Sequence, residues 1–269
     1  MSVPDGRVTL GPAPATPAGN PSAFYYDRAY SRWVPVGRGA VSPDVRHYAY
    51  MSYQDAHRGV LTIVDVATGA VRTHPATPDQ PQLFYVIIDY AKEGIYLALA
   101  YIEGPIRGLW LMDPSTGTIR KVANLFDINA IAGSVVWLGS LNPADPNPMG
   151  GLGVSPDSVD SFDIFAGVRT AWLYLPGRGV WVVGVDLAGH PIVQAGDINN
   201  DDELLLLTAP NTAEQIFQGP STKLPWLSRP IADSHGVWFG SSSGIYLYSP
   251  TVGLRRVSDQ AGYPGNSCT

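Results

Sequence analysis

Cysteine is nearly absent from this sequence, and so are long apolar runs and blocks of like charge. Among 269 residues only Cys268 is a cysteine, which excludes an internal disulfide framework and metal sites built on several thiolates. Charged residues make up only 15% of the chain, the net charge is -6 and no basic stripe occurs, so we expect no nucleic-acid partner. The apolar runs 83–88 and 95–102 are too short to span a membrane, so we expect no transmembrane segment.

The N-terminus lacks the basic and apolar regions of a secretory signal peptide. The compartment therefore stays open, and an extracellular or cell-envelope location is favoured only if a signal or anchor segment has been removed. What the chain does contain is 45% hydrophobic residues, 29 glycines and 24 prolines. Glycine and proline at this frequency leave little room for long helices, and the composition is typical of many short strands around a large core. We therefore expect an all-β fold.

A degenerate repeat of about 45 residues carries the prediction of architecture. In its first register a β-rich run meets Asp, Ser, Thr or Pro, then small residues, then a second β-rich run, which is the pattern of a hairpin. LTIVDVATGAVRT is one such segment and LWLMDPSTGTIRKV another. Six copies begin at Phe24, Leu61, Leu109, Trp172, Leu204 and Ile245.

The second register lies upstream of the first and supplies an earlier turn and strand. Its six copies begin at Val3, Val41, Ile87, Ala130, Gly184 and Ile231. Together the two registers describe a four-stranded antiparallel blade, which cannot bury both of its faces without neighbours. We therefore predict a six-bladed β-propeller over residues 1–269 as a single domain, with five or seven blades as the alternatives.

Two of the repeats carry a family resemblance. The segments SPDVRHYAY, from Ser42, and LTIVDVATGAV, from Leu61, resemble repeats of the TolB-type propellers within the WD-repeat-like superfamily. In that family Ser-Pro-Asp forms the first turn of a blade and Asp-x-x-Thr-Gly the third. The resemblance implies a fold and no particular activity, because propellers carry many unrelated functions.

Binding in propellers usually uses the face that carries the loops between second and third strands. Here those loops differ in length, and blade four has the longest, an insertion at about 142–167. Loops of that length are usually functional or disordered, so we expect the insertion to be the principal contact surface. The candidate ligand-binding residues from this and neighbouring loops are Asp55, His57, Arg58, Glu103, Arg107, Asp145, Asp157, Asp160 and Asp163.

One loop has a partial metal-binding pattern. Asp197, Asn199 and Asp201 alternate as do the first three ligands of an EF-hand-like calcium loop. Asp202 stands where that loop needs glycine and Thr208 where it needs glutamate. We therefore expect an Asx-rich turn and no resident cofactor, with calcium as the alternative.

The histidines do not form a metal-ligand spacing. His47, His190 and His235 each follow the first turn of a blade, where a polar residue entering a strand has a structural role.

Two functions are compatible with these patterns. The first is a non-catalytic, monomeric binding propeller that engages a protein or glycan through its loop face, because no nucleophile elbow or acid–base motif stands out. The alternative is a propeller hydrolase or lyase that uses carboxylates such as Glu103, Asp145 or Asp163 at the central funnel. The sequence favours binding and leaves the ligand open.

Overall fold

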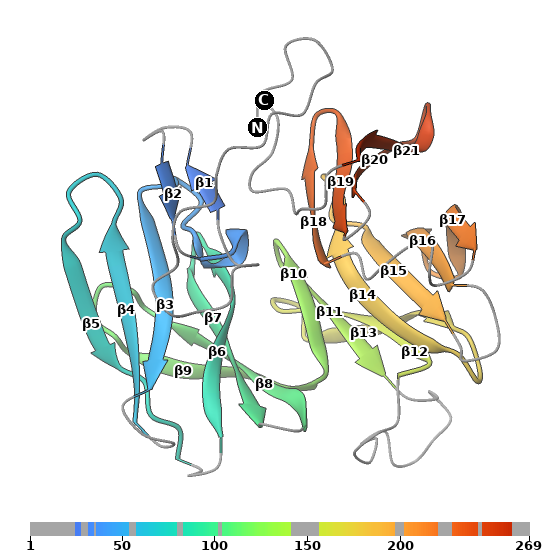
Figure 1. Cartoon of the computed structure of the whole chain (residues 1–269). Coiled ribbons are helices and arrows are strands. Elements are labelled where there is room, and N and C mark those ends of the chain that lie inside the picture. Colours follow the sequence, from blue (N-terminus) through green and yellow to red (C-terminus); the bar gives the residue numbers. More distant parts are fainter. Residues whose placement is uncertain are drawn as a thin grey trace. The chain divides into compact units, whose positions relative to one another are not determined.

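The computed structural model describes residues 25–27, 32–34, 36–53, 58–79, 83–101, 104–140, 156–196, 202–219, 228–241 and 244–259. These residues belong to two compact units, one ending at Ile128 and the other beginning at Asn129. Antiparallel strands form both units (Figure 1), which confirms the all-β expectation. In the described residues the helical structure is one 3-10 turn, η1 (Arg38–Ala40), and no helix there is long and apolar enough to cross a membrane.

The unit that ends at Ile128 contains three sheets in chain order. An isolated bridge between Val41 and Tyr48 adds a short pairing beside the first strand of the second sheet. The strands are β1 (Tyr25–Asp27) and β2 (Arg32–Val34) in the first sheet, β3 (His47–Tyr53), β4 (Gly59–Asp65) and β5 (Val71–Pro75) in the second, and β6 (Phe84–Ala91), β7 (Gly94–Tyr101), β8 (Gly104–Met112) and β9 (Ile119–Phe126) in the third.

The unit that begins at Asn129 contains three four-stranded sheets, each with its strands in chain order. These are β10 (Ile128–Ala132), β11 (Val135–Ser140), β12 (Ser158–Asp163) and β13 (Val168–Tyr174), then β14 (Gly179–Val185), β15 (Pro191–Gly196), β16 (Asp202–Ala209) and β17 (Thr212–Gly219), and finally β18 (Ser228–Asp233), β19 (Gly236–Ser241), β20 (Gly244–Ser249) and β21 (Gly253–Ser258).

Burial on both faces explains the run of four leucines in β16. Leu204 and Leu206 pack with Ile192, Val237 and Phe239, toward the β18–β21 sheet. The alternate residues Leu205 and Leu207 pack on the opposite face, against the β10–β13 sheet. Because successive side chains of a strand point to opposite faces, a strand between two sheets is apolar at every position.

The repeat predicts the hairpins of most sheets correctly. The copies from Leu61, Leu109, Leu204 and Ile245 form β4–β5, β8–β9, β16–β17 and β20–β21. The blade-four assignment is wrong. The copy from Trp172 covers the end of β13, the connection and the start of β14, so it joins two sheets.

The predicted loop at about 142–167 also requires correction, because its C-terminal part is a strand. β12 pairs with β11 and β13, and residues 164–167 form the turn that follows it. In this turn the Gly167 amide donates to the Asp163 carbonyl at 2.9 Å, as the Gly69 amide does to the Asp65 carbonyl. Residues 141–155 lie outside the described part of the chain.

A contact between β5 and the β8–β9 turn joins two sheets of the first unit, and a glycine in that turn makes room for it. Nε2 of His74, in β5, lies 3.1 Å from the Pro114 carbonyl of this turn. A Cβ on Gly117 would lie 2.4 Å from Nδ1 of His74, and the glycine has a φ of +77°. Gly69 has a similar φ, +73°, with open space around it.

We therefore expect Gly117→Ala to cost more stability than Gly69→Ala. Both alanines adopt the left-handed conformation, which costs about 1–2 kcal/mol. Only the alanine at 117 overlaps His74, so its loss of unfolding free energy should be larger by at least about 1 kcal/mol. Equilibrium unfolding of both variants in urea provides the comparison. Equal losses would show that the close approach to His74 carries no cost.

Candidate functional site

Each four-stranded sheet has two ends with different chain connections. At the turn edge, short turns join the first strand to the second and the third to the fourth. At the loop edge, the second strand ends, the third begins and the chain passes to the next sheet. The sequence places ligand binding at the loop edge.

The structure describes some of the predicted binding residues, and the others lie outside its described part. Arg58 immediately precedes β4, and Arg107 lies near the start of β8, so both lie at the loop edge of the first unit. The guanidinium carbon of Arg107 stacks 5.3 Å from the ring centre of Phe126. The candidates Asp55, His57, Glu103, Asp145, Asp197, Asn199 and Asp201 lie outside the described residues.

Asp160 is at the centre of a buried polar network in the β10–β13 sheet. Its side chain is 8% exposed and its Oδ2 lies 2.5 Å from Nη2 of Arg169. The same Oδ2 accepts hydrogen bonds from Nε of Arg169 at 2.7 Å and from Oγ of Ser140 at 3.1 Å. Oγ of Ser158 lies 2.7 Å from Oγ of Ser140 and extends the network toward the loop edge. This aspartate is held by the fold, in contrast to the loop residue that the sequence predicts.

Asp157 marks the loop edge of the same sheet. Its amide donates to the Ser140 carbonyl at 3.1 Å, and its carbonyl accepts the Leu175 amide at 2.8 Å. Ser140 therefore contacts both Asp157 and Asp160. Oδ1 of Asp157 is buried without a hydrogen-bond partner in the described part of the chain, and so is Oδ1 of Asp160.

Asp163 lies at the opposite end of β12, at the turn edge, so the prediction that it belongs to the binding loop is wrong. Its Oδ1 accepts the amides of Phe165 and Ala166, both at 2.8 Å. The bond from the Ala166 amide, followed by that from Phe165, lowers the pKa of this carboxyl. This is the capping of an Asx-type turn, in which the aspartate stabilises its own backbone.

An arginine–glutamate pair fixes the connection between the β10–β13 and β14–β17 sheets. Nη1 of Arg178 donates to Oε2 of Glu203 at 2.9 Å, and Nη2 donates to the Ala195 carbonyl at 2.9 Å. Both side chains retain about a fifth of their exposure, at 21% and 20%. The loop edge of these two sheets thus presents a fixed pair of opposite charges beside Asp157, and we call Asp157, Arg178 and Glu203 the loop-edge cluster.

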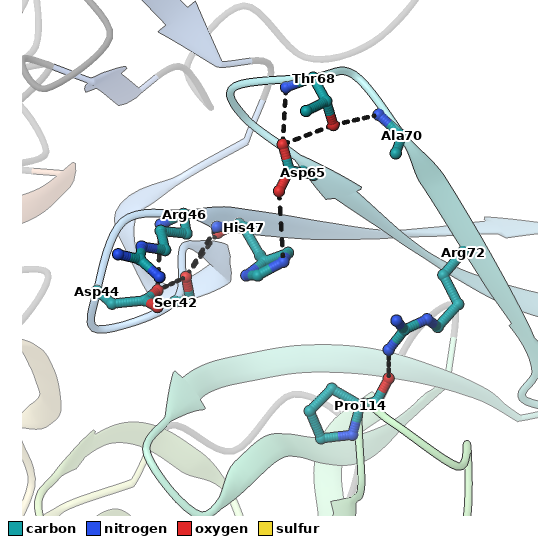
Figure 2. Close-up of polar contacts among 9 residues, drawn as sticks. All are labelled: Ser42, Asp44, Arg46, His47, Asp65, Thr68, Ala70, Arg72 and Pro114. Atoms are coloured by element: carbon teal, nitrogen blue, oxygen red, sulfur yellow. Dashed lines mark hydrogen bonds and ion pairs between the residues drawn. The ribbon is translucent and has the colours of Figure 1, made fainter.

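The turn edge of the first unit carries polar contacts that close turns. Figure 2 shows Asp65 facing Thr68 and His47. Oδ1 of Asp65 accepts the Thr68 amide at 2.7 Å, and Nε2 of His47 lies 3.8 Å from Oδ2. In the preceding turn, Oγ of Ser42 donates to Oδ1 of Asp44 at 2.7 Å and accepts the His47 amide at 2.9 Å.

In two sheets of the other unit a histidine pairs with the aspartate of its own turn, whereas Asp65 lies opposite His47 on the neighbouring strand. Nδ1 of His190 lies 3.1 Å from Oδ2 of Asp186, and Nδ1 of His235 lies 3.5 Å from Oδ1 of Asp233. In both turns the aspartate also accepts the histidine amide. In all three cases the aspartate beside the histidine also caps a turn, which supports the structural role expected for these histidines.

Asp89 is a buried carboxyl that the sequence reasoning missed as a candidate. It lies in β6 opposite Tyr96 of β7, beside a shift in strand register. Burial raises its pKa to about 6, although the Arg38 guanidinium in η1 and the Tyr90 amide act in the opposite direction. η1 lies close over this strand, because a Cβ on Gly39 would meet the Ile88 carbonyl at 2.9 Å. Perturbed pKa values occur at functional sites and in buried structural groups alike, and burial is the cause at Asp89.

Metal binding finds no support in the geometry of the described residues. They contain no group of three or more histidine, cysteine or acidic side chains arranged to hold an ion. The calcium alternative concerns residues outside this part of the chain.

Comparisons with known proteins reach the level of the fold. No family model and no curated protein matches the sequence. Prolyl oligopeptidase B from Galerina marginata superposes with a TM-score of 0.56 at 14% identity, over 82% of this chain and 34% of that one. Its matching part is a β-propeller domain. The fold is a β-propeller.

Two other solved structures also match this chain. An uncharacterized protein from Listeria monocytogenes gives a TM-score of 0.53 at 11% identity, over 83% of this chain and 69% of that one. Oligogalacturonate lyase from Vibrio parahaemolyticus gives 0.50 at 12% identity, over 82% of this chain and 65% of that one. At such identities the propeller is similar to these proteins in fold alone.

Proposed function

We propose that this propeller is a non-catalytic binding module that engages a protein or glycan partner through its loop edge. The observation that carries the proposal is that Arg178 holds Glu203 in place at the loop edge, where both side chains keep about a fifth of their exposure. Charges that the fold already holds in place bind a polar partner at little ordering cost. A general acid, in contrast, needs a carboxyl that is positioned to give its proton to a substrate.

The loop-edge cluster provides the test. We expect Arg178→Gln to weaken binding to a ligand found on an oligosaccharide and protein array by about tenfold, which corresponds to about 1.4 kcal/mol. The variant should remain folded, although loss of this mostly buried ion pair should lower the melting temperature measurably. Arg46→Gln, at the turn edge, is the matched control and should bind normally. Turnover of any ester or oligosaccharide in the same panel would contradict the proposal and favour the hydrolase or lyase alternative.

We further propose that the ring has six blades of the TolB-type arrangement. Support comes from the five larger sheets together with the β1–β2 hairpin, which occupy the six successive positions of the repeat. An experimental structure with five or seven blades would contradict it.

A further inference from the structure

Tyr53 is an aromatic residue that the fold fixes at the loop edge of the unit that ends at Ile128. β3 ends at Tyr53, opposite Gly59 at the start of β4. The Tyr53 hydroxyl donates a hydrogen bond to the Tyr85 carbonyl in β6, and its ring meets Phe84 edge to face with 5.5 Å between the ring centres. A Cβ on Gly59 would lie 3.0 Å from Cε1 of Tyr53, so the glycine leaves room for the ring. Contacts with β4 and β6 therefore hold this ring in one orientation.

The ring stays accessible although its surroundings are packed. Tyr53 is 38% exposed, whereas Phe84 is half-buried and Tyr85 is buried. Burial raises the pKa of Tyr53 to about 12, so its hydroxyl keeps at neutral pH the proton that it donates to Tyr85. The Tyr85 ring meets Trp110 edge to face, with 5.6 Å between the ring centres. Tyr53 is thus the exposed end of a continuous aromatic group, and we call Tyr53 and Phe84 the aromatic platform.

The size of the exposed apolar surface favours a sugar over a protein as its occupant. Among the described residues of this unit, the exposed large apolar side chains are Tyr50, Tyr53 and Val71. Tyr50 lies on the opposite face of β3, three positions from Tyr53, and Val71 begins β5 at the turn edge. A single exposed ring offers far less than the roughly 800 Å² that each partner contributes to a stable protein interface. It is comparable in size to one face of a pyranose ring.

Arg107 adds hydrogen-bond donors at the same edge. Strand pairing sets Phe84 opposite Ala100, and Leu99 opposite Arg107. Neighbouring strands lie about 4.8 Å apart, so two strand spacings, about 10 Å, separate the backbones of Phe84 and Arg107. Arg107 is exposed, and its guanidinium carbon stacks 5.3 Å from the ring centre of Phe126. A stacked guanidinium keeps its in-plane N–H donors for hydrogen bonds, which the hydroxyl groups of a sugar accept.

Sugars with equatorial hydroxyl groups are complementary to such a ring. Their C–H bonds lie on the two flat faces of the pyranose, and these hydrogens carry partial positive charge that the negative face of an aromatic ring attracts. A ring that is already fixed loses little conformational freedom when a sugar stacks on it. We propose that the aromatic platform and Arg107 bind an oligosaccharide of equatorially substituted pyranoses, such as a β-1,4-linked glucan. This inference rests on the proposed function, because it assigns a ligand class to the loop edge.

Isothermal titration calorimetry with cellohexaose and chitohexaose tests the inference. The wild type should bind at least one of them, and Tyr53→Leu should raise its dissociation constant at least about tenfold, because leucine keeps apolar bulk without an aromatic face. Tyr53→Phe keeps the ring and should bind nearly as tightly as the wild type. Tyr50→Leu, at a ring that is 39% exposed on the opposite face of β3, is the matched control and should bind normally. Arg107→Gln leaves the platform intact and should weaken binding about fivefold, which provides a second test if Tyr53→Leu does not fold.

Two results would overturn the inference. One is a wild type that binds neither oligosaccharide, and the other is oligosaccharide binding that Tyr53→Leu or, where that variant does not fold, Arg107→Gln leaves unchanged. The proposed function would stand in both cases if a protein on the array bound the wild type and Arg178→Gln weakened that binding. A wild type that binds neither the two oligosaccharides nor any ligand on the array would contradict the proposed function as well.

Discussion

Replacing Arg169 with alanine is expected to lower the free energy of unfolding by about 3 kcal/mol, because it leaves the buried carboxylate of Asp160 without its cation. The aspartate side chain is 8% exposed, whereas that of Arg169 is 46% exposed. The loss therefore comes mainly from the desolvated partner left behind, and much less from attraction in water. Urea unfolding monitored by tryptophan fluorescence measures the change.

Two controls separate the ion pair from general effects of losing an arginine. Arg255, exposed on β21, is also in the last strand of a sheet, and Arg255→Ala should change stability by less than about 0.5 kcal/mol. The double variant Asp160→Ala with Arg169→Ala should lose less than the two single losses combined, because the charges disappear together. Additive losses would show that Arg169 stabilises the sheet by packing and not by pairing with Asp160.

Replacing Asp89 with asparagine is expected to stabilise the protein at pH 8 by up to about 3 kcal/mol, with little effect at pH 4. The folded-state pKa of about 6 lies above the ordinary value of 3.8. The unfolded chain therefore loses this proton first as pH rises, and stability falls between about pH 4 and pH 6. Asparagine has the same shape and no charge to bury, so the variant escapes this loss.

Unfolding free energies of the wild type and Asp89→Asn at both pH values test this expectation. Asp113→Asn is a control of opposite sign, because bonds from the Ser115 hydroxyl and amide lower the pKa of Asp113. Its stability should fall relative to the wild type at pH 8. A stability gain for Asp89→Asn that is the same at pH 4 and pH 8 would contradict the assigned role of burial.

The hairpins were predictable wherever the turn kept its polar residues. DVATG, from Asp65, and DPSTG, from Asp113, carry hydroxyl groups that bond to the aspartate, and that composition marks a turn in the sequence alone. DIFAG, from Asp163, folds in the same way through its backbone amides. Because Phe165 is large and apolar, the composition of this segment does not indicate a turn. The spacing from Asp to Gly was the signal that could have identified β12.

The candidate site was less predictable, because its contacts depend on strand register. The strand pairing sets Asp160 opposite Ala171 and Phe162 opposite Arg169, with a register shift before Asp160. Asp160 and Arg169 therefore meet as diagonal neighbours, which composition and spacing along the chain do not reveal. The loop-edge cluster likewise combines Asp157, which precedes β12, Arg178, in the connection before β14, and Glu203, in β16. Their proximity arises only from packing.

The contact between His74 and the β8–β9 turn also limits which substitutions homologous sequences can carry. Open space surrounds Gly69, so a relative could carry asparagine there, the non-glycine residue that most readily adopts a left-handed backbone. Gly117 has no such freedom while a histidine occupies position 74. We therefore expect the two positions to change together in homologous sequences, with a larger residue at 117 appearing only where a smaller one has replaced His74.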